Sequence, residues 1–215
     1  MPRLFDYQRG VMVTTSLKVL YSTLVYHQHL KQVGEPAAIR LLLGRRVKRH
    51  VMFVRNPHSR LVSAWADKFL EHPRRLGEEG FSGWQRIQRI YLQHTGFQKW
   101  ASDEAIRDAL LATSFPEFVS HLSGIYWRDE HLQPQHWVMS IRYKGVIPIL
   151  PLRFDQVIRV EQMDAAALRR ELGIDVVGVR RNVTDHPPAD DLFTPELRMT
   201  VRRLYKRDFE KFGYE

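Results

Sequence analysis

The stretch that decides the fold spans residues 49–65 and reads RHVMFVRNPHSRLVSAW. Residues 51–54 form a short continuous apolar run, which is typical of a parallel strand covered on both faces. Asn56 is a favourable N-cap residue and Pro57 suits the first position of a helix, so we expect a helix to follow directly. Arg55 would then lie at the carboxyl end of the strand, where open α/β sheets bind their ligands.

Ser63 lies on the second turn of this expected helix. An arginine with a nearby hydroxyl and free helix N–H groups suits a phosphate. The alternative is an ordinary strand-to-helix crossover with a surface arginine. The stretch by itself leaves both interpretations open.

A second strand–turn–helix unit is expected in residues 10–30. Residues 11–13 are strand-like, and the hydroxyl residues 14–16 supply N-cap chemistry for a helix that would begin at Ser16. The apolar residues that follow have the spacing of an amphipathic helix: Leu17, Leu20, Tyr21, Leu24 and Val25. Three hydroxyls at a helix N-terminus would form an anion site, whereas the alternative is an ordinary capped helix. Two anion pockets at neighbouring strand ends would suit one ligand with phosphate groups at both ends.

The composition indicates one folded domain over residues 1–215. The chain has 215 residues, 44% hydrophobic and 27% charged, which suits one α/β domain with a sizeable core. It contains no cysteine, which excludes disulfides and thiolate metal sites and fits a reducing cytoplasm. No segment approaches the ~18–20 apolar residues of a membrane span, and residues 1–6 lack the apolar core of a signal peptide. We therefore expect a cytoplasmic protein without an integral membrane segment.

The formal net charge of +9 favours anionic partners. Nucleic acid, an acidic membrane surface, a phosphate-rich cofactor and an acidic glycan all remain open on charge alone. The absence of a Walker A pattern and of Gly-x-Gly-x-x-Gly disfavours ordinary nucleoside triphosphatases and dinucleotide enzymes. The histidine spacing does not match the His-Glu-x-x-His zinc motif, so no metal is expected.

Three segments resemble the PAPS-dependent carbohydrate sulfotransferases, Golgi-type enzymes with bacterial relatives that use 3′-phosphoadenosine 5′-phosphosulfate (PAPS) as co-substrate. They are Arg-x-Pro-x-x-Arg-Leu-x-Ser-Ala-aromatic at residues 55–65, His-x-x-Pro-Gln at residues 131–135, and the ending YKRDFEKFGY at residues 205–214. The resemblance implies a P-loop-like three-layer α/β fold, with a central parallel sheet flanked by helices, in a single sulfotransferase domain. It also implies that Arg55 and Ser63 grip the 3′-phosphate of PAPS.

Residues 13–18 resemble the 5′-phosphosulfate loop of the same family. The resemblance implies that four residues of this loop contact the donor: Thr14, Thr15, Ser16 and Lys18. The family's loop usually opens with Pro-Lys, whose lysine contacts the bridging oxygen of the departing group, but Val11 occupies the aligned position here. Arg9 or Lys18 would have to supply this charge. A loop that borders the nucleotide in the family makes Arg181 a further cofactor-binding candidate.

A histidine is the expected general base, because imidazole titrates near neutrality and can accept a hydroxyl proton. His131, in the His-x-x-Pro-Gln segment, is the first candidate, and His29, in a His-x-His pair, is the second. The alternatives are a capped turn or a core histidine for the former and a histidine near a helix end for the latter.

The resulting hypothesis is in-line transfer of the sulfuryl group of PAPS to a hydroxyl of a carbohydrate or other small hydroxylated acceptor. It requires neither a metal nor nucleic acid. The alternatives are a PAPS-binding protein impaired in catalysis, suggested by Val11, and a basic nucleic-acid-binding module, suggested by the charge. The sequence leaves the acceptor and the oligomeric state open.

Overall fold

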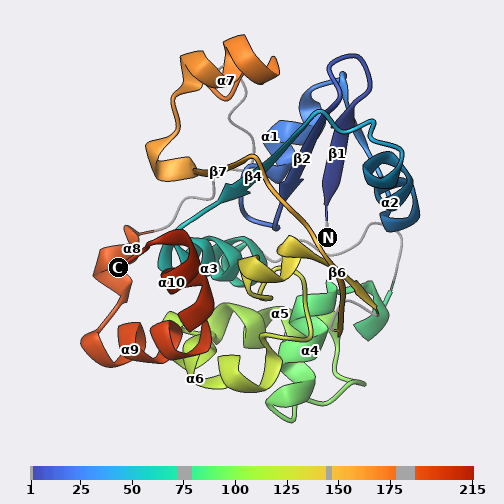
Figure 1. Cartoon of the computed structure of the whole chain (residues 1–215). Coiled ribbons are helices and arrows are strands. Elements are labelled where there is room, and N and C mark those ends of the chain that lie inside the picture. Colours follow the sequence, from blue (N-terminus) through green and yellow to red (C-terminus); the bar gives the residue numbers. More distant parts are fainter. Residues whose placement is uncertain (1, 72–78, 144–146, 178–186) are drawn as a thin grey trace. The chain divides into compact units, whose positions relative to one another are not determined.

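The computed structural model describes residues 2–71, 79–143, 147–177 and 187–215. Contacts divide the chain into two compact units, each assembled from segments that are distant in the sequence (Figure 1). Unit 1 comprises Met1–Asn56, Gln135–Val183 and Glu210–Glu215, and unit 2 comprises Pro57–Pro134 and Thr184–Phe209. The single domain expected over residues 1–215 stays a prediction.

Among its described residues, unit 1 is built on a five-stranded sheet. The strand order is β3 (Leu30–Gln32), β1 (Arg3–Asp6), β2 (Val11–Thr15), β4 (Arg49–Val54) and β7 (Gln156–Arg159). β2, β4 and β7 pair in parallel, whereas β1 is antiparallel to both β2 and β3. In this five-stranded sheet β1 alone therefore runs opposite to the other four strands, and β4 contains the strand expected at residues 51–54.

The other elements of unit 1 include helices on both faces of this sheet. They are α1 (Tyr21–Tyr26), α2 (Glu35–Leu43), η3 (Gln135–Met139), η4 (Val160–Gln162) and α7 (Ala165–Leu172). A separate antiparallel pair consists of β5 (Ser140–Tyr143) and β6 (Ile147–Pro151). α10 (Lys206–Phe212) contributes residues to both units.

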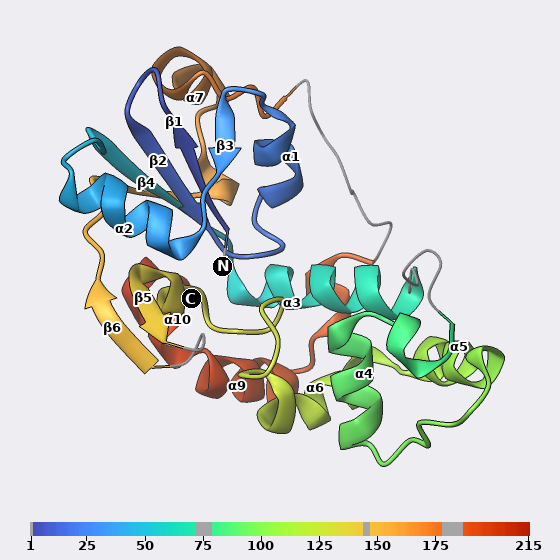
Figure 2. The same cartoon turned by 90° about the vertical axis from the view of Figure 1, so that its right-hand side faces the viewer.

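Side chains of β4 alternate between the two faces, because successive residues of a strand point in opposite directions. Val51 and Phe53 pack in one apolar cluster with residues of α1 and α7. Met52 and Val54 pack in another, with residues of η3 and α10. α2 packs on the neighbouring part of this second face, against β1 and β2 (Figure 2). The predicted three-layer α/β architecture is therefore confirmed.

Unit 2 is helical in its described residues. Its elements are α3 (Pro57–Trp65), the π-helix η1 (Ala66–Leu70), η2 (Phe81–Gly83), α4 (Arg86–His94), α5 (Asp103–Ala112), α6 (Phe115–Ile125), α8 (Ala189–Leu192) and α9 (Pro195–Leu204). The hydroxyls of Ser114 and Thr194 cap α6 and α9. The core is aromatic, with the ring of Phe69 4.9 Å from that of Tyr91 and 5.0 Å from that of Phe118. No helix in the described ranges is long and apolar enough to cross a membrane.

The first helix begins later than the sequence predicted. We expected it to start at Ser16, but β2 extends to Thr15 and α1 starts at Tyr21. Thr15 remains in the strand because it pairs with Phe53 of β4. Strand pairing between distant segments here outweighs a local capping preference, which is a weak determinant of structure.

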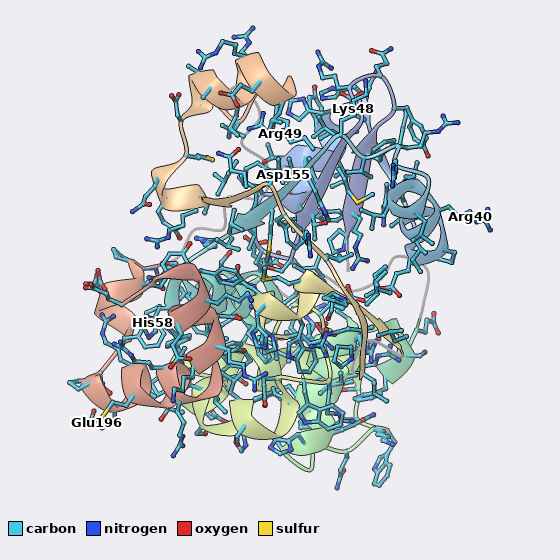
Figure 3. The ribbon with its side chains drawn as sticks, in the orientation of Figure 1. Arg40, Lys48, Arg49, His58, Asp155 and Glu196 are labelled. Atoms are coloured by element: carbon cyan, nitrogen blue, oxygen red, sulfur yellow. The ribbon has the colours of Figure 1, made fainter. Side chains whose placement is uncertain are left out.

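His50 lies in a buried polar group of unit 1. Its Nε2 lies 2.8 Å from Oγ1 of Thr14, and its backbone N–H donates to Oδ2 of Asp155 at 2.7 Å (Asp155 is labelled in Figure 3). Burial is the main cause that lowers the pKa of His50 to about 4, and the charge of Arg3 acts in the same direction. The folded protein therefore favours the neutral imidazole.

We expect the free energy of unfolding to fall as the pH drops from about 6.5 to about 4. The pKa of His50 is about 4 in the folded protein against an ordinary value of 6.5, so the unfolded chain binds more protons in this window. Such a shift is worth up to about 3 kcal/mol. Urea unfolding across this pH range measures the loss. The dependence should become shallower in His50→Gln but not in His94→Gln, an exposed control on α4; equal slopes in both variants would contradict the role of His50.

Candidate functional site

Two strand ends lie side by side in unit 1. β2 and β4 are parallel neighbours in which Thr15 pairs with Phe53, so both chains leave the sheet at the same edge. The loop 16–20 follows β2, and Arg55 follows β4. Nη1 of Arg55 donates to the backbone oxygen of Lys18 at 3.3 Å. The neighbouring strand ends expected from the sequence are therefore present and in contact.

The backbone of Arg55 is held by Gln135, the last residue of the His-x-x-Pro-Gln segment. The N–H of Arg55 donates to Oε1 of Gln135 at 2.9 Å, and Nε2 of Gln135 donates to the oxygen of Arg55 at 2.6 Å. Gln135 is fully buried. Sequence reasoning singled out the histidine of this segment and missed the glutamine, because the pairing joins residues 80 positions apart.

The guanidinium of Arg55 is half-buried beside a tyrosine and a carboxylate. Burial lowers the pKa of Arg55, while Glu161 and Tyr214 act to raise it. Glu161 accepts a hydrogen bond from the N–H of Asn56 at 2.7 Å and one from the hydroxyl of Tyr214 at 2.9 Å. An arginine guanidinium can form strong, charge-assisted hydrogen bonds with a phosphate group.

The hydroxyls of Thr14 and Thr15, at the end of β2, and of Ser16, directly after it, are not equally available. Oγ1 of Thr14 is engaged with His50. Oγ1 of Thr15 donates to the backbone oxygens of Ser16 at 3.1 Å and Val19 at 2.6 Å. Oγ of Ser16 is buried and has no hydrogen-bond partner among the described residues. Of the three expected hydroxyls, Ser16 is thus the one whose bonding is incomplete.

Lys18 lies within the loop, in a strained backbone conformation. Its φ is 67° and that of Leu20 is 55°, both in the left-handed region that non-glycine residues rarely adopt. Strained residues concentrate at functional sites. The loop that follows β2 therefore runs over residues 16–20 and includes a lysine. Val11, which the sequence alignment placed at the lysine position, lies at the opposite end of β2.

Arg9 lies away from the end of β2 at which the loop 16–20 contacts Arg55. It belongs to the turn before β2, where its Nη1 pairs with Oδ2 of Asp6 at 3.0 Å. β2 separates it from Ser16, and five strand residues span roughly 13 Å or more. The structure thus brings Lys18, and not Arg9, to the contact with Arg55.

His29 lies at the same distant end of the sheet as Arg9. It directly precedes β3, whose Leu30 pairs with Asp6. Its ring lies 5.6 Å from that of His27. Burial lowers the pKa of His29, while the charge of Asp6 raises it. His29 is therefore not placed near the loop 16–20.

Two further candidates for binding the cofactor, Ser63 and Arg181, are not among the described residues of unit 1. Ser63 is buried on α3 of unit 2, as its predicted helical position requires. That Ser63 and Arg55 bind the same phosphate group stays a prediction. Arg181 lies outside the described residues.

His131 forms a short hydrogen bond with a buried carboxylate in unit 2. Its Nδ1 lies 2.7 Å from Oδ1 of Asp129, and 24% of the His131 side chain is exposed against 4% of that of Asp129. Burial alone would raise the pKa of Asp129, but hydrogen bonds and charge from His131, with the charge of Arg86, hold it below its usual value. An ionised Asp129 can only accept, so Nδ1 of His131 carries a proton, and in the neutral imidazole Nε2 is the nitrogen that can accept one.

Two buried side chains fix the loop that carries His131. Nη2 of Arg60 donates to the backbone oxygens of His131 at 3.0 Å and Gln133 at 2.9 Å. The hydroxyl of Tyr205 donates to the oxygen of Leu132 at 2.6 Å. Both belong to segments that the sequence analysis highlighted, but their function there was missed because it depends on contacts more than 70 positions apart.

The described parts of the chain contain no group of three or more His, Cys, Asp or Glu side chains that could hold a metal ion. The expectation that no metal is needed stays a prediction.

A family model described as the sulfotransferase family matches residues 45–215. The chain is 26% identical over 174 residues to carbohydrate sulfotransferase 10 of Xenopus laevis, which covers 75% of this chain and 46% of that protein. It is also 26% identical over 208 residues to carbohydrate sulfotransferase 10 of Mus musculus, which covers 89% of this chain and 55% of that protein. The chain thus spans about half the length of the curated relatives it matches. No solved structure matches it.

Replacing Lys18 by glycine should raise the free energy of unfolding by up to about 1 kcal/mol, because glycine adopts the left-handed conformation without a steric penalty. Urea unfolding provides the measurement. Lys31→Gly, at an exposed position of β3, is the matched control and should lower stability by about 0.5–1 kcal/mol. Equal losses in the two variants would show that the backbone of Lys18 is not strained.

Proposed function

Because the chain belongs to the sulfotransferase family, we propose that it transfers the sulfuryl group of PAPS to a hydroxyl of a carbohydrate acceptor. The observation that carries the proposal is the contact between two strand ends, in which Arg55 reaches the loop 16–20. One nucleotide with anionic groups on both sides of its ribose suits this arrangement. The named relatives are carbohydrate sulfotransferases, which supports a sugar acceptor.

The residues that follow β2 and β4 have the chemistry needed to bind PAPS. Ser16 has a buried hydroxyl without a hydrogen-bond partner among the described residues. Lys18 belongs to the strained loop after β2. We assign it the contact with the bridging oxygen of the departing group, which a lysine makes in the family and which Val11, at the aligned position, cannot make. Arg55 presents a half-buried guanidinium. These are hydrogen-bond donors and cations, as a phosphosulfate and a phosphate require.

When bound, PAPS supplies an activated sulfuryl group on a phosphate leaving group. In our proposal Arg55 holds the 3′-phosphate and thereby positions the donor. Ser16 and Lys18 direct donors towards the oxygens where negative charge grows during transfer. The fixed geometry supplies most of the acceleration, since positioning and charge stabilisation dominate in the related case of phosphoryl transfer.

His131 is the proposed general base for the acceptor hydroxyl. Asp129 fixes the proton on Nδ1 of His131, so Nε2 is oriented as a proton acceptor. A buried carboxylate that orients a histidine in this way also stabilises the imidazolium that forms. Arg60 and Tyr205 hold the loop and act as positioning residues.

A second candidate function is binding of PAPS or its product without transfer. It is favoured by the internal hydrogen bonds of Thr14 and Thr15, which leave fewer donors for the sulfuryl oxygens. Binding of nucleic acid remains the third candidate, on charge alone. A cytoplasmic location stays a prediction.

Adenosine 3′,5′-bisphosphate (PAP) should stabilise the wild-type protein against thermal unfolding, and ATP or duplex DNA should do so less. At 100 times its dissociation constant the gain is about 2.7 kcal/mol. Arg55→Ala should bind PAP about 10–100-fold more weakly, because charge-assisted hydrogen bonds are worth about 1.5–3 kcal/mol. Arg9→Ala is the matched control and should bind normally. PAP binding to Arg55→Ala as tight as to wild type would refute the phosphate site.

Transfer of radiolabelled sulfate from PAPS to a panel of unsulfated glycans should fall about 10²–10⁴-fold in His131→Ala, the range for loss of a general base. His29→Ala should stay within about twofold of wild type, because His29 lies at the other end of the sheet. Unchanged PAP stabilisation in both variants serves as the folding control. Full turnover in His131→Ala would exclude it as the base, and PAP binding without any wild-type transfer would favour the second candidate function.

A further inference from the structure

An exposed tryptophan shares the loop of the proposed base. Trp127 is 47% exposed and lies four residues before His131. Its indole makes no hydrogen bond or ring contact with any other residue in the part of the chain that the structure describes. Leu132, the other large apolar residue of this loop, is fully buried. The fold therefore uses Leu132 for packing and leaves one flat aromatic face of the loop unused.

The backbone that carries Trp127 is fixed. Its oxygen accepts a hydrogen bond from Nε2 of Gln133 at 2.9 Å, which closes the loop on itself. The N–H of Gln133 also donates to the oxygen of Asp129 at 2.9 Å. Arg60 and Tyr205 hold the far end of the same loop. An aromatic side chain with two rotatable bonds on a rigid backbone loses little entropy when it binds a ligand.

The short chain between Trp127 and His131 limits how far apart the two residues can lie. Four residues span at most about 14 Å even when fully extended, and the closure between Trp127 and Gln133 makes the separation shorter. A pyranose ring has an apolar face of C–H groups and an edge of hydroxyls. Stacking its face on an indole buries the C–H groups and leaves the hydroxyls directed outward, where a base can reach one of them.

We propose that Trp127 is the acceptor platform of the site, on which a sugar ring stacks so that a hydroxyl is presented to Nε2 of His131. The inference rests on the proposed function and deepens it, because it selects pyranose rings over flexible small alcohols. Trp127 would be a substrate-binding residue, with no part in donor binding. Its half-exposed indole then has a function that packing does not give it.

The test compares Trp127→Ala, Trp127→Leu and Trp127→Phe with Trp100→Ala, a control that removes a tryptophan that is 81% exposed elsewhere in unit 2. The probes are hexasaccharides of unsulfated chondroitin, heparosan and N-acetyllactosamine. For each probe that accepts sulfate, alanine and leucine should raise the acceptor KM about 10–100-fold, equivalent to about 1.4–2.7 kcal/mol. Phenylalanine should restore most of the affinity. The kcat and the affinity for PAP should change less than about threefold, as should all parameters of Trp100→Ala.

A binding measurement separates this inference from the proposed function. Each hexasaccharide is titrated into PAP-saturated protein while tryptophan fluorescence is recorded. A saturable change in wild type and Trp100→Ala that disappears in Trp127→Ala supports the platform even if no sulfate is transferred. A normal acceptor KM in Trp127→Ala, leucine as effective as phenylalanine, or no Trp127-dependent signal with any probe would overturn it. Transfer that is absent while the Trp127-dependent signal persists would count against the proposed function alone.

Discussion

The parallel pairing of β2 with β4 is the constraint on which the candidate donor site depends. Because Thr15 stands beside Phe53, the loop 16–20 and Arg55 must leave the sheet at one edge. The hydrogen bond from Arg55 to Lys18 then joins two segments that are 37 positions apart. Gln135 adds a third segment by bonding both backbone groups of Arg55. Because these hydrogen bonds restrain Arg55, it needs little reorganisation to bind an anion.

The same pairing explains why some basic residues that are close in sequence to the loop 16–20 are far from it in the structure. Arg9 and His29 are a cation and an imidazole close in sequence to the loop 16–20, but they lie at the opposite end of the strands. Arg9 lies in the turn just before the start of β2, and His29 directly precedes Leu30, which pairs with Asp6 at that same end of the sheet. Proximity along the chain is therefore a poor guide here, because one strand length separates the two ends of the sheet.

Unit 2 uses buried polar groups to hold one loop. Arg60 is 2% exposed and directs its guanidinium to backbone oxygens, and Tyr205 is also 2% exposed and bonds Leu132. Buried donors of this kind are costly unless they are satisfied, so the loop and its anchors stabilise one another. The result is a fixed Asp129–His131 pair, with Trp127 exposed nearby. The proposed base and the proposed acceptor platform thus lie on one short loop whose backbone is held by buried donors.

By itself the sequence determined the strand at residues 51–54 and the helix start at Pro57. These two features depend on local periodicity, capping and proline geometry, which act between near neighbours in the chain. The three-layer α/β fold was implied by the resemblance to a known family. Only the tertiary structure decided that β2 ends at Thr15, that Val11 lies at the end of β2 opposite to the loop 16–20, and that His29 is remote from this loop. Strand pairing between segments far apart fixes these points, and local capping signals at residues 14–16 could not reveal it. The sequence also could not predict that Gln135 bonds Arg55 or that Arg60 bonds the loop of His131. Hydrogen bonds between distant segments produce no periodic pattern in a sequence.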